Sequence, residues 1–220
     1  MVHAPRARRR DRDAVAALSD GRAARRSAHE RSLGARPEGA GFDVGLQRTD
    51  LHPASWDNVN GRTQILTFAH GDGPGSRWTS GLRVGGTCQF FGPRRSLDLE
   101  APVVLFGDET SFGLGVALRD SPRRVGATYV FEVSNLAESR AVLAAIGLGD
   151  AIVIERTADD AHLAEAETEL ARLATDGTHF ILTGKATSVQ RVNRALKAAG
   201  IVSSRVRIKA YWARGKTGLD

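Results

Sequence analysis

The stretch Val103-Val104-Leu105-Phe106-Gly107-Asp108-Glu109-Thr110-Ser111 decides the fold class of this chain. Four consecutive apolar residues that end in a glycine are typical of a strand buried on both faces of a parallel sheet. The Asp, Thr and Ser that follow are residue types favoured at helix starts. The stretch therefore predicts a strand, a tight turn and a helix in direct succession.

Strand and helix patterns alternate regularly after this stretch. Short apolar or alternating runs predict strands over 128–133, 151–154, 180–182 and 206–211, and helical spacing predicts helices over 138–146, 160–174 and 188–199. Strands alternating with helices of about three turns are typical of right-handed βαβ units. We therefore expect an α/β domain with a parallel sheet over residues 101–220.

The region before residue 100 follows a different pattern. Strands are expected over 63–70 and 87–91, and the first is followed by His70-Gly71-Asp72-Gly73-Pro74-Gly75-Ser76-Arg77-Trp78. Strands without long intervening helices favour a piece of an antiparallel barrel. The glycines would let backbone N–H groups approach a phosphate, and a helix opening at Ser76 would add partial positive charge. Such loops are also common without any ligand, so this feature alone leaves both interpretations open.

Composition is that of an ordinary globular protein, with 41% hydrophobic and 25% charged residues among 220. No apolar run reaches the roughly 18–20 residues needed to cross a bilayer, and no secretory signal is visible. Cys88 is the single cysteine, which excludes an intrachain disulfide and a cysteine-based metal site. We expect a cytoplasmic protein.

The net charge of +6 is unevenly distributed. Residues 1–50 hold eleven arginines and no lysine, with little strand or helix periodicity apart from a short apolar patch at 14–18. We expect residues 1–53 to form an Arg-rich, disordered segment. A nucleic-acid-binding arm is an alternative, but the interspersed acids and missing aromatics argue against it.

Two further motifs lie near the carboxyl ends of expected strands. Thr183-Gly184-Lys185 follows the strand over 180–182, where open α/β sheets bind ligands, but its spacing is not that of a P-loop. Lys209-Ala210-Tyr211-Trp212-Ala213-Arg214-Gly215-Lys216 is either a final strand with a solvated basic tail or a platform for an anionic aromatic ligand. The histidines show no metal-ligand spacing, and no catalytic triad or paired carboxylates stand out.

Together these segments resemble the siderophore-interacting proteins, a flavin-dependent branch of the ferredoxin-reductase-like fold. The resemblance extends over about residues 48–220, in the stretches Arg48-Thr49 with Pro53 and Trp56-Asp57, His70–Trp78, Phe106–Ser111, Thr183-Gly184-Lys185 and Lys209–Asp220. It implies a partial FAD-binding antiparallel barrel over 54–100 and a nicotinamide-binding domain over 101–220. It also implies transfer of electrons from NADPH or NADH through FAD to a ferric siderophore, with release of iron(II).

The resemblance assigns candidate residues to each ligand. For FAD these are Arg48, Thr49, His70, Gly73, Pro74, Ser76 and Trp78. For the nicotinamide cofactor they are Gly107, Asp108, Glu109, Thr110, Thr183 and Gly184, and for the siderophore Lys209, Trp212, Arg214 and Lys216, with Tyr211-Trp212 bordering the flavin site. The choice between NADH and NADPH stays open, because no arginine can be assigned to a 2′-phosphate.

The chain departs from the family pattern upstream. The family has Arg-x-Tyr-Thr where this chain reads Arg48-Thr49-Asp50-Leu51-His52-Pro53, and residues 1–47 lack the pattern of the family's barrel strands. Asp-Leu-His-Pro can be coded GAC-CTA-CAC-CCC, which gives Thr-Tyr-Thr-Pro when read one nucleotide later. A truncated or out-of-frame N-terminus would explain both departures, and the alternative function is then a flavin-incompetent remnant or binding module without redox activity.

Overall fold

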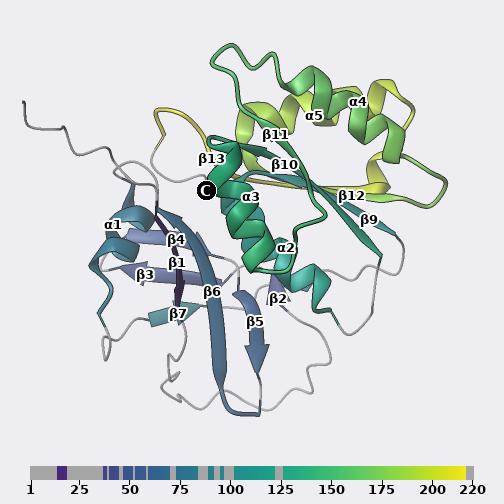
Figure 1. Ribbon diagram of the computed structural model, residues 1–220. Helices are drawn as coiled ribbons and strands as arrows, with labels where there is room; N and C mark the ends of the chain where they lie inside the picture. Colours follow the sequence, from purple (N-terminus) through teal and green to yellow (C-terminus); the bar gives the residue numbers. More distant parts are fainter. Residues whose placement is uncertain are drawn as a thin grey trace, which may run out of the picture.

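The computed structural model describes residues 14–18, 37–38, 40–44, 47–51, 53–57, 59–69, 73–83, 89–91, 95–96, 102–121 and 126–216. The second half of the chain forms a five-stranded sheet in the order β11-β10-β9-β12-β13, and all of its strand pairs are parallel (Figure 1). Its strands are β9 (Val103–Gly107), β10 (Ala127–Val133), β11 (Ile152–Glu155), β12 (His179–Lys185) and β13 (Val206–Trp212). The expected α/β fold with a parallel sheet is confirmed.

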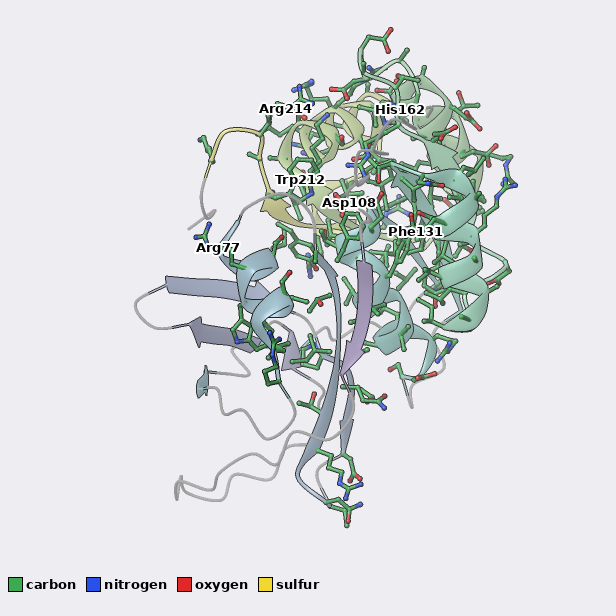
Figure 2. The ribbon with its side chains drawn as sticks, turned by 60° about the vertical axis from the view of Figure 1, so that its left-hand side comes forward. Arg77, Asp108, Phe131, His162, Trp212 and Arg214 are labelled. Atoms are coloured by element: carbon green, nitrogen blue, oxygen red, sulfur yellow. The ribbon has the colours of Figure 1, made fainter. Side chains whose placement is uncertain are left out.

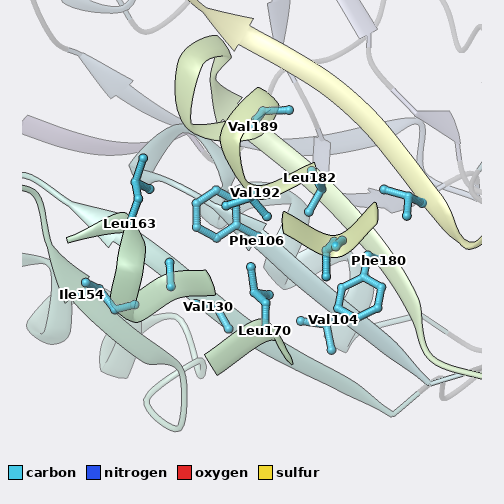
Figure 3. Packing of buried hydrophobic residues seen from close by; sticks show 13 residues of the cluster. Val104, Phe106, Val130, Ile154, Leu163, Leu170, Phe180, Leu182, Val189 and Val192 are labelled. Atoms are coloured by element: carbon cyan, nitrogen blue, oxygen red, sulfur yellow. The ribbon is translucent and has the colours of Figure 1, made fainter. Parts of the chain in front are cut away.

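Helices cover both faces of this sheet. In Figure 1, α4 (Leu163–Leu173) and α5 (Ala186–Ala198) lie on one face, and α2 (Phe112–Arg119) and α3 (Leu136–Ala145) lie on the other. Residues of β9 alternate between the two: Val104 and Phe106 pack with α4 and α5, whereas Val103 and Leu105 pack with α2 and α3. Figure 3 shows the first of these two cores. The run of fully buried residues in β9 is thus the centre of a three-layer domain.

The helix starts differ from the predicted ones for local reasons. Helix α3 begins earlier, at Leu136, because the side chain of Asn135 caps it and accepts a hydrogen bond from Glu138 N at 3.0 Å. Helix α4 begins later, at Leu163, since the chain from residue 157 to 162 forms a turn in which Asp160 has φ of 59°. Helix α5 begins at Ala186, directly after β12, without an intervening loop.

Antiparallel strands make up the first half. One three-stranded sheet has the order β1 (Ala14–Leu18), β6 (Arg62–Ala69), β5 (Pro53–Asp57). Another has the order β4 (Gln47–Leu51), β3 (Ala40–Val44), β7 (Gln89–Phe91). The short strands β2 (Pro37–Glu38) and β8 (Arg95–Ser96) form a pair. Strands β1 to β4 differ from the expected disordered segment over 1–53. Strands β1, β2 and β3 pair with β6, β8 and β7, which are distant in sequence, and β4 pairs with its sequence neighbour β3. The expected domain boundaries at 53 and 100 stay predictions.

Helix α1 (Pro74–Gly81) follows β6 through the glycine-rich segment. Its N-cap is Gly73 and Pro74 is its first residue, so the helix opens two residues before Ser76, which had been expected to open it. Proline suits the first helical position because its missing N–H has no helical partner there. Helix α1 contacts β4 and β6, and α2 contacts β5 and β6, so α2 joins the two halves (Figure 1). Among the helices of the described residues, none is both long and apolar enough to span a bilayer.

Candidate functional site

The candidate site lies where the order of the parallel strands reverses. Strand β9 leads to β10 on one side, while its other neighbour, β12, leads to β13 on the opposite side. Open α/β sheets bind ligands at such a switch point, outside the carboxyl ends of the strands. The hydroxyl of Thr183, on β12, connects the two central strands at this point. It donates a hydrogen bond to Ser111 Oγ at 2.8 Å and lies 3.2 Å from Phe106 O. Two motifs more than seventy residues apart in sequence therefore meet at one crevice.

Two glycines allow the chain to pack closely at this switch point, where open α/β sheets have their ligand crevice. Gly184 has φ of +97°, and a Cβ at this position would lie 2.6 Å from Asp108 Oδ2. A Cβ on Gly107 would overlap the side chain of Ser111. Both positions are therefore restricted to glycine by close approach, and Gly184 also by its backbone conformation.

Asp108 is the central polar group of the crevice, and it is fully buried. Its carboxylate accepts hydrogen bonds from Thr110 N at 2.9 Å, from the Thr110 hydroxyl and from Trp212 Nε1 at 2.7 Å. Burial raises the pKa of Asp108, and the neighbouring Glu109 raises it further, while the hydrogen bonds and Arg156 oppose the shift. The arrangement makes Asp108 an internal support of the β9 turn, with Trp212 tied to it across the sheet.

Glu109 joins the carboxyl ends of β9, β10 and β11. Its Oε1 accepts hydrogen bonds from Ser134 N at 2.5 Å and Ser134 Oγ at 2.6 Å, and its Oε2 forms an ion pair with Arg156. The Arg156 guanidinium also lies 5.8 Å from the ring centroid of Trp212. Sequence reasoning missed Arg156 and Ser134. Their one available signal was their position just after a predicted strand, where a parallel sheet gathers its polar residues.

A model of the siderophore-interacting protein family matches residues 100–215. The chain belongs to this family. No curated protein sequence matches it. Among solved structures, the siderophore-interacting protein from Acinetobacter baumannii is similar with a TM-score of 0.64 and 17% identity, over 83% of this chain and 79% of that one. A siderophore utilization protein from T. fusca is similar with a TM-score of 0.62 and 21% identity, over 88% of this chain and 85% of that one. An Amycolatopsis cytochrome P450 reductase is similar with a TM-score of 0.61 and 14% identity, over 82% of this chain and 61% of that one. At these identities the likeness shows a shared ferredoxin-reductase-like fold.

In this siderophore-interacting protein, Trp212 stands apart from the other residues expected at the siderophore. Figure 2 shows it beside Asp108, so its indole belongs to the crevice. Lys209 lies exposed on β13, and Arg214 and Lys216 are exposed just beyond that strand. The structure thus brings the expected nicotinamide residues together and adds Trp212 to them, and it places the three cations on the surface near the same strand.

The residues expected at FAD lie on two neighbouring elements. Arg48 and Thr49 are in β4, and Gly73, Pro74, Ser76 and Trp78 are at the start of or within α1, which contacts β4. His70 lies outside the described residues. The backbone therefore brings the two groups side by side, and their roles toward a flavin stay a prediction.

We expect the substitution Trp212→Phe to lower the free energy of unfolding by about 1–3 kcal/mol, because the buried Asp108 loses a hydrogen-bond donor. Urea denaturation measures this. The control is the same substitution in an Asp108→Ala background, where the bond is already absent. An equal cost in the two backgrounds would show that the bond to Asp108 adds nothing to stability.

A third buried carboxylate lies on the face of the sheet that α4 and α5 cover. Glu132, on β10, is 1% exposed. Its Oε2 is 2.7 Å from His162 Nε2 and accepts a hydrogen bond from Ser188 Oγ at 3.1 Å, while Oε1 has no hydrogen-bond partner among the described residues. Burial is the main cause that raises the pKa of Glu132, opposed by the bonds to His162 and Ser188.

This raised pKa predicts a pH-dependent stability. The folded protein holds the Glu132 proton more tightly than the unfolded chain, so its contribution to stability is full below the ordinary pKa of 4.5 and is lost as the pH rises through the raised value. Glu132→Gln should remove this slope, which is at most about 1.4 kcal/mol per pH unit for one proton. The variant should therefore gain stability relative to wild type as the pH rises above 4.5, measured by urea denaturation at a series of pH values. The exposed Glu138→Gln is the control, and parallel curves for Glu132→Gln and wild type would contradict the prediction.

Proposed function

We propose that this protein is an FAD-dependent oxidoreductase that passes electrons from NADPH or NADH to a ferric siderophore. The observation that carries the proposal is the close packing of Gly107, Thr183 and Gly184 at the switch point of a chain that belongs to the siderophore-interacting protein family. Glycines at such a point let the backbone come close to a pyrophosphate.

The chain's residues suit a dinucleotide at this crevice in a specific way. The absence of a Cβ at Gly184 and Gly107 lets β12 pack closely against the β9 turn, and Thr183 places its hydroxyl at the junction of β9 and β12. The Arg156 ion pair balances the charge of Glu109, and burial raises the pKa of Asp108, so both carboxyl groups repel an anionic ligand less than free carboxylates would. The Trp212 indole lies beside Asp108, with the Arg156 guanidinium 5.8 Å from its ring centroid.

The start of α1 suits the pyrophosphate of a flavin. Its N-cap is Gly73, and no acidic residue lies in its first turn, so the positive end of the helix dipole is not neutralised there. When bound, FAD supplies the chemistry that converts a two-electron hydride transfer into single-electron transfers to iron. The role of β4 and α1 is to hold and orient that group.

The exposed cations at the end of β13 suit an anionic substrate. Lys209, Arg214 and Lys216 are exposed on or just beyond the strand whose Trp212 reaches into the crevice. Positive charge near a binding site raises the local concentration of an anionic ligand. We propose that these residues attract the ferric siderophore, which is the substrate that gives up its iron as iron(II).

The test is spectroscopic. The purified protein is mixed with FAD, desalted, and its visible spectrum recorded; bands at about 450 nm that stay with the protein and bleach with NADPH or NADH support the proposal. Adding a ferric siderophore and an iron(II)-specific chelator should then restore the oxidised flavin spectrum and colour the chelator. Protein that retains no flavin, and still binds a ferric siderophore, would instead favour a binding module without redox activity.

A further inference from the structure

Glu132, buried beneath the candidate crevice, leads by a chain of contacts to the residues of β12 that line it. Burying a carboxylate costs free energy unless its hydrogen bonds are well made. The carboxylate of Glu132 reaches the first residues of two helices, His162 at the start of α4 and Ser188 in the first turn of α5. Figure 2 shows His162 on the face of the sheet opposite to Phe131.

The hydrogen bonds of His162 fix its tautomer and close a turn. Thr157 N donates to His162 Nδ1 at 3.1 Å, so Nδ1 carries no proton and Nε2–H donates to Glu132. In return, the backbone N–H of His162 donates to Thr157 Oγ1 at 3.3 Å. Both ends of the turn over 157–162 are therefore tied to one another and, through the imidazole, to β10.

This turn contacts the last residue of β12 and helix α5. Asp160, in the left-handed region at φ of 59°, accepts a hydrogen bond from Lys185 Nζ at 2.6 Å, and its carbonyl accepts one from Arg191 Nη1 at 3.0 Å. The side chain of Lys185 is 13% exposed. Lys185 directly follows Gly184, so the ion pair between Lys185 and Asp160 restrains the backbone of Gly184 at the switch point.

We propose that Glu132 is a positioning residue for the dinucleotide crevice: acting through His162, it holds the 157–162 turn so that Asp160 fixes Lys185 and, with it, the backbone of Thr183 and Gly184. The part that concerns a dinucleotide rests on the proposed function. Glu132 itself touches no ligand. Its effect on binding is transmitted through a series of contacts, from Glu132 to His162, through the turn to Asp160, and from Asp160 to Lys185.

Three variants test this order. Glu132→Leu removes the acceptor for His162, Glu132→Gln keeps an acceptor in the same shape, and Asp160→Asn removes only the charge that holds Lys185. Asparagine tolerates the left-handed backbone at position 160. Asp159→Asn is the control for Asp160→Asn in the same turn. Asp159 interacts with Ala161 N and the Thr157 side chain, whereas the ion pair with Lys185 is made by Asp160.

Hydrogen–deuterium exchange is the first readout and needs no ligand. Glu132→Leu should speed exchange at least tenfold in both 157–162 and 183–188. Asp160→Asn should do so in 183–188 while the amide of Thr157 stays protected. Glu132→Gln should stay within threefold of wild type in both segments, and Asp159→Asn should stay within threefold in 183–188. Should Glu132→Leu fail to fold, Asp160→Asn still decides: unchanged exchange in 183–188 overturns the proposal.

The second readout is the dissociation constant for NADPH and NADH, measured by calorimetry on the full chain with FAD present. Glu132→Leu and Asp160→Asn should each weaken binding about tenfold, which corresponds to about 1.4 kcal/mol. The double variant should be no weaker than Glu132→Leu alone, because both act through Lys185. Additive losses overturn the inference. If the wild type binds neither dinucleotide, the proposed function is wrong, and the exchange data alone decide the inference.

Discussion

Replacing Gly184 by alanine should abolish binding of the nicotinamide cofactor and lower the free energy of unfolding by about 2–5 kcal/mol. Two costs combine at this position. The φ of +97° is strained for any residue with a Cβ, and the new methyl would lie 2.6 Å from the carboxylate of Asp108. Asp108 is buried and held by Thr110 and Trp212, so it cannot move aside without breaking those bonds. Urea denaturation and calorimetric titration with NADPH measure the two effects.

Gly177→Ala is the matched control for this substitution. Gly177 has a similar φ of +87°, but a Cβ there would meet nothing within 4 Å. It should show only the backbone strain, about 1–2 kcal/mol, and leave cofactor binding unchanged. The difference between the two variants measures the close approach of β12 to Asp108. If the two variants lose equal stability, that approach does not restrict position 184.

Replacing Arg156 by alanine should cost about 3–5 kcal/mol of stability, because it leaves the carboxylate of Glu109 buried without its cation. The side chains of this ion pair are 16% and 4% exposed, so solvent screens it little. The same change removes the guanidinium beside the ring of Trp212 and should loosen the C-terminal strand over the crevice. Thermal and urea denaturation measure the loss, and the double variant Arg156→Ala with Glu109→Gln should recover part of it.

Arg172→Ala gives the comparison for a surface pair. Arg172 bonds to Glu169 within α4, and their side chains are 61% and 28% exposed. Water and salt screen such a pair, so the substitution should cost about 0–1 kcal/mol. A cost for Arg156→Ala no larger than this would show that the Glu109 pair is not a structural support of the site.

The sequence alone predicted the second half of the fold well, for a local reason. Buried strands such as β9 need continuous apolar residues, and helices such as α5 repeat them every three or four positions, so both patterns can be read directly from the chain. The same patterns placed Gly107 and Thr183-Gly184 at the ends of predicted strands, whereas the strand order that brings them together at a switch point came from the structure. The antiparallel strands β2 and β3 could not be read in this way, because they pair with β8 and β7, which are distant in sequence. Strand β4 pairs with its sequence neighbour β3, and its residues carry no alternating apolar pattern.

What the sequence by itself determined is the alternation that makes a parallel sheet, together with the glycines at the ends of β9 and β12. Only the tertiary structure decided which polar side chains share the crevice. Trp212 meets Asp108 across 104 residues, Arg156 meets Glu109 across 47, and Glu132 meets His162 across 30. The physical reason is that the periodicity of a helix or strand fixes the face on which a side chain lies. Its hydrogen-bond or ion-pair partner depends instead on the strand order and on how deeply both groups are buried.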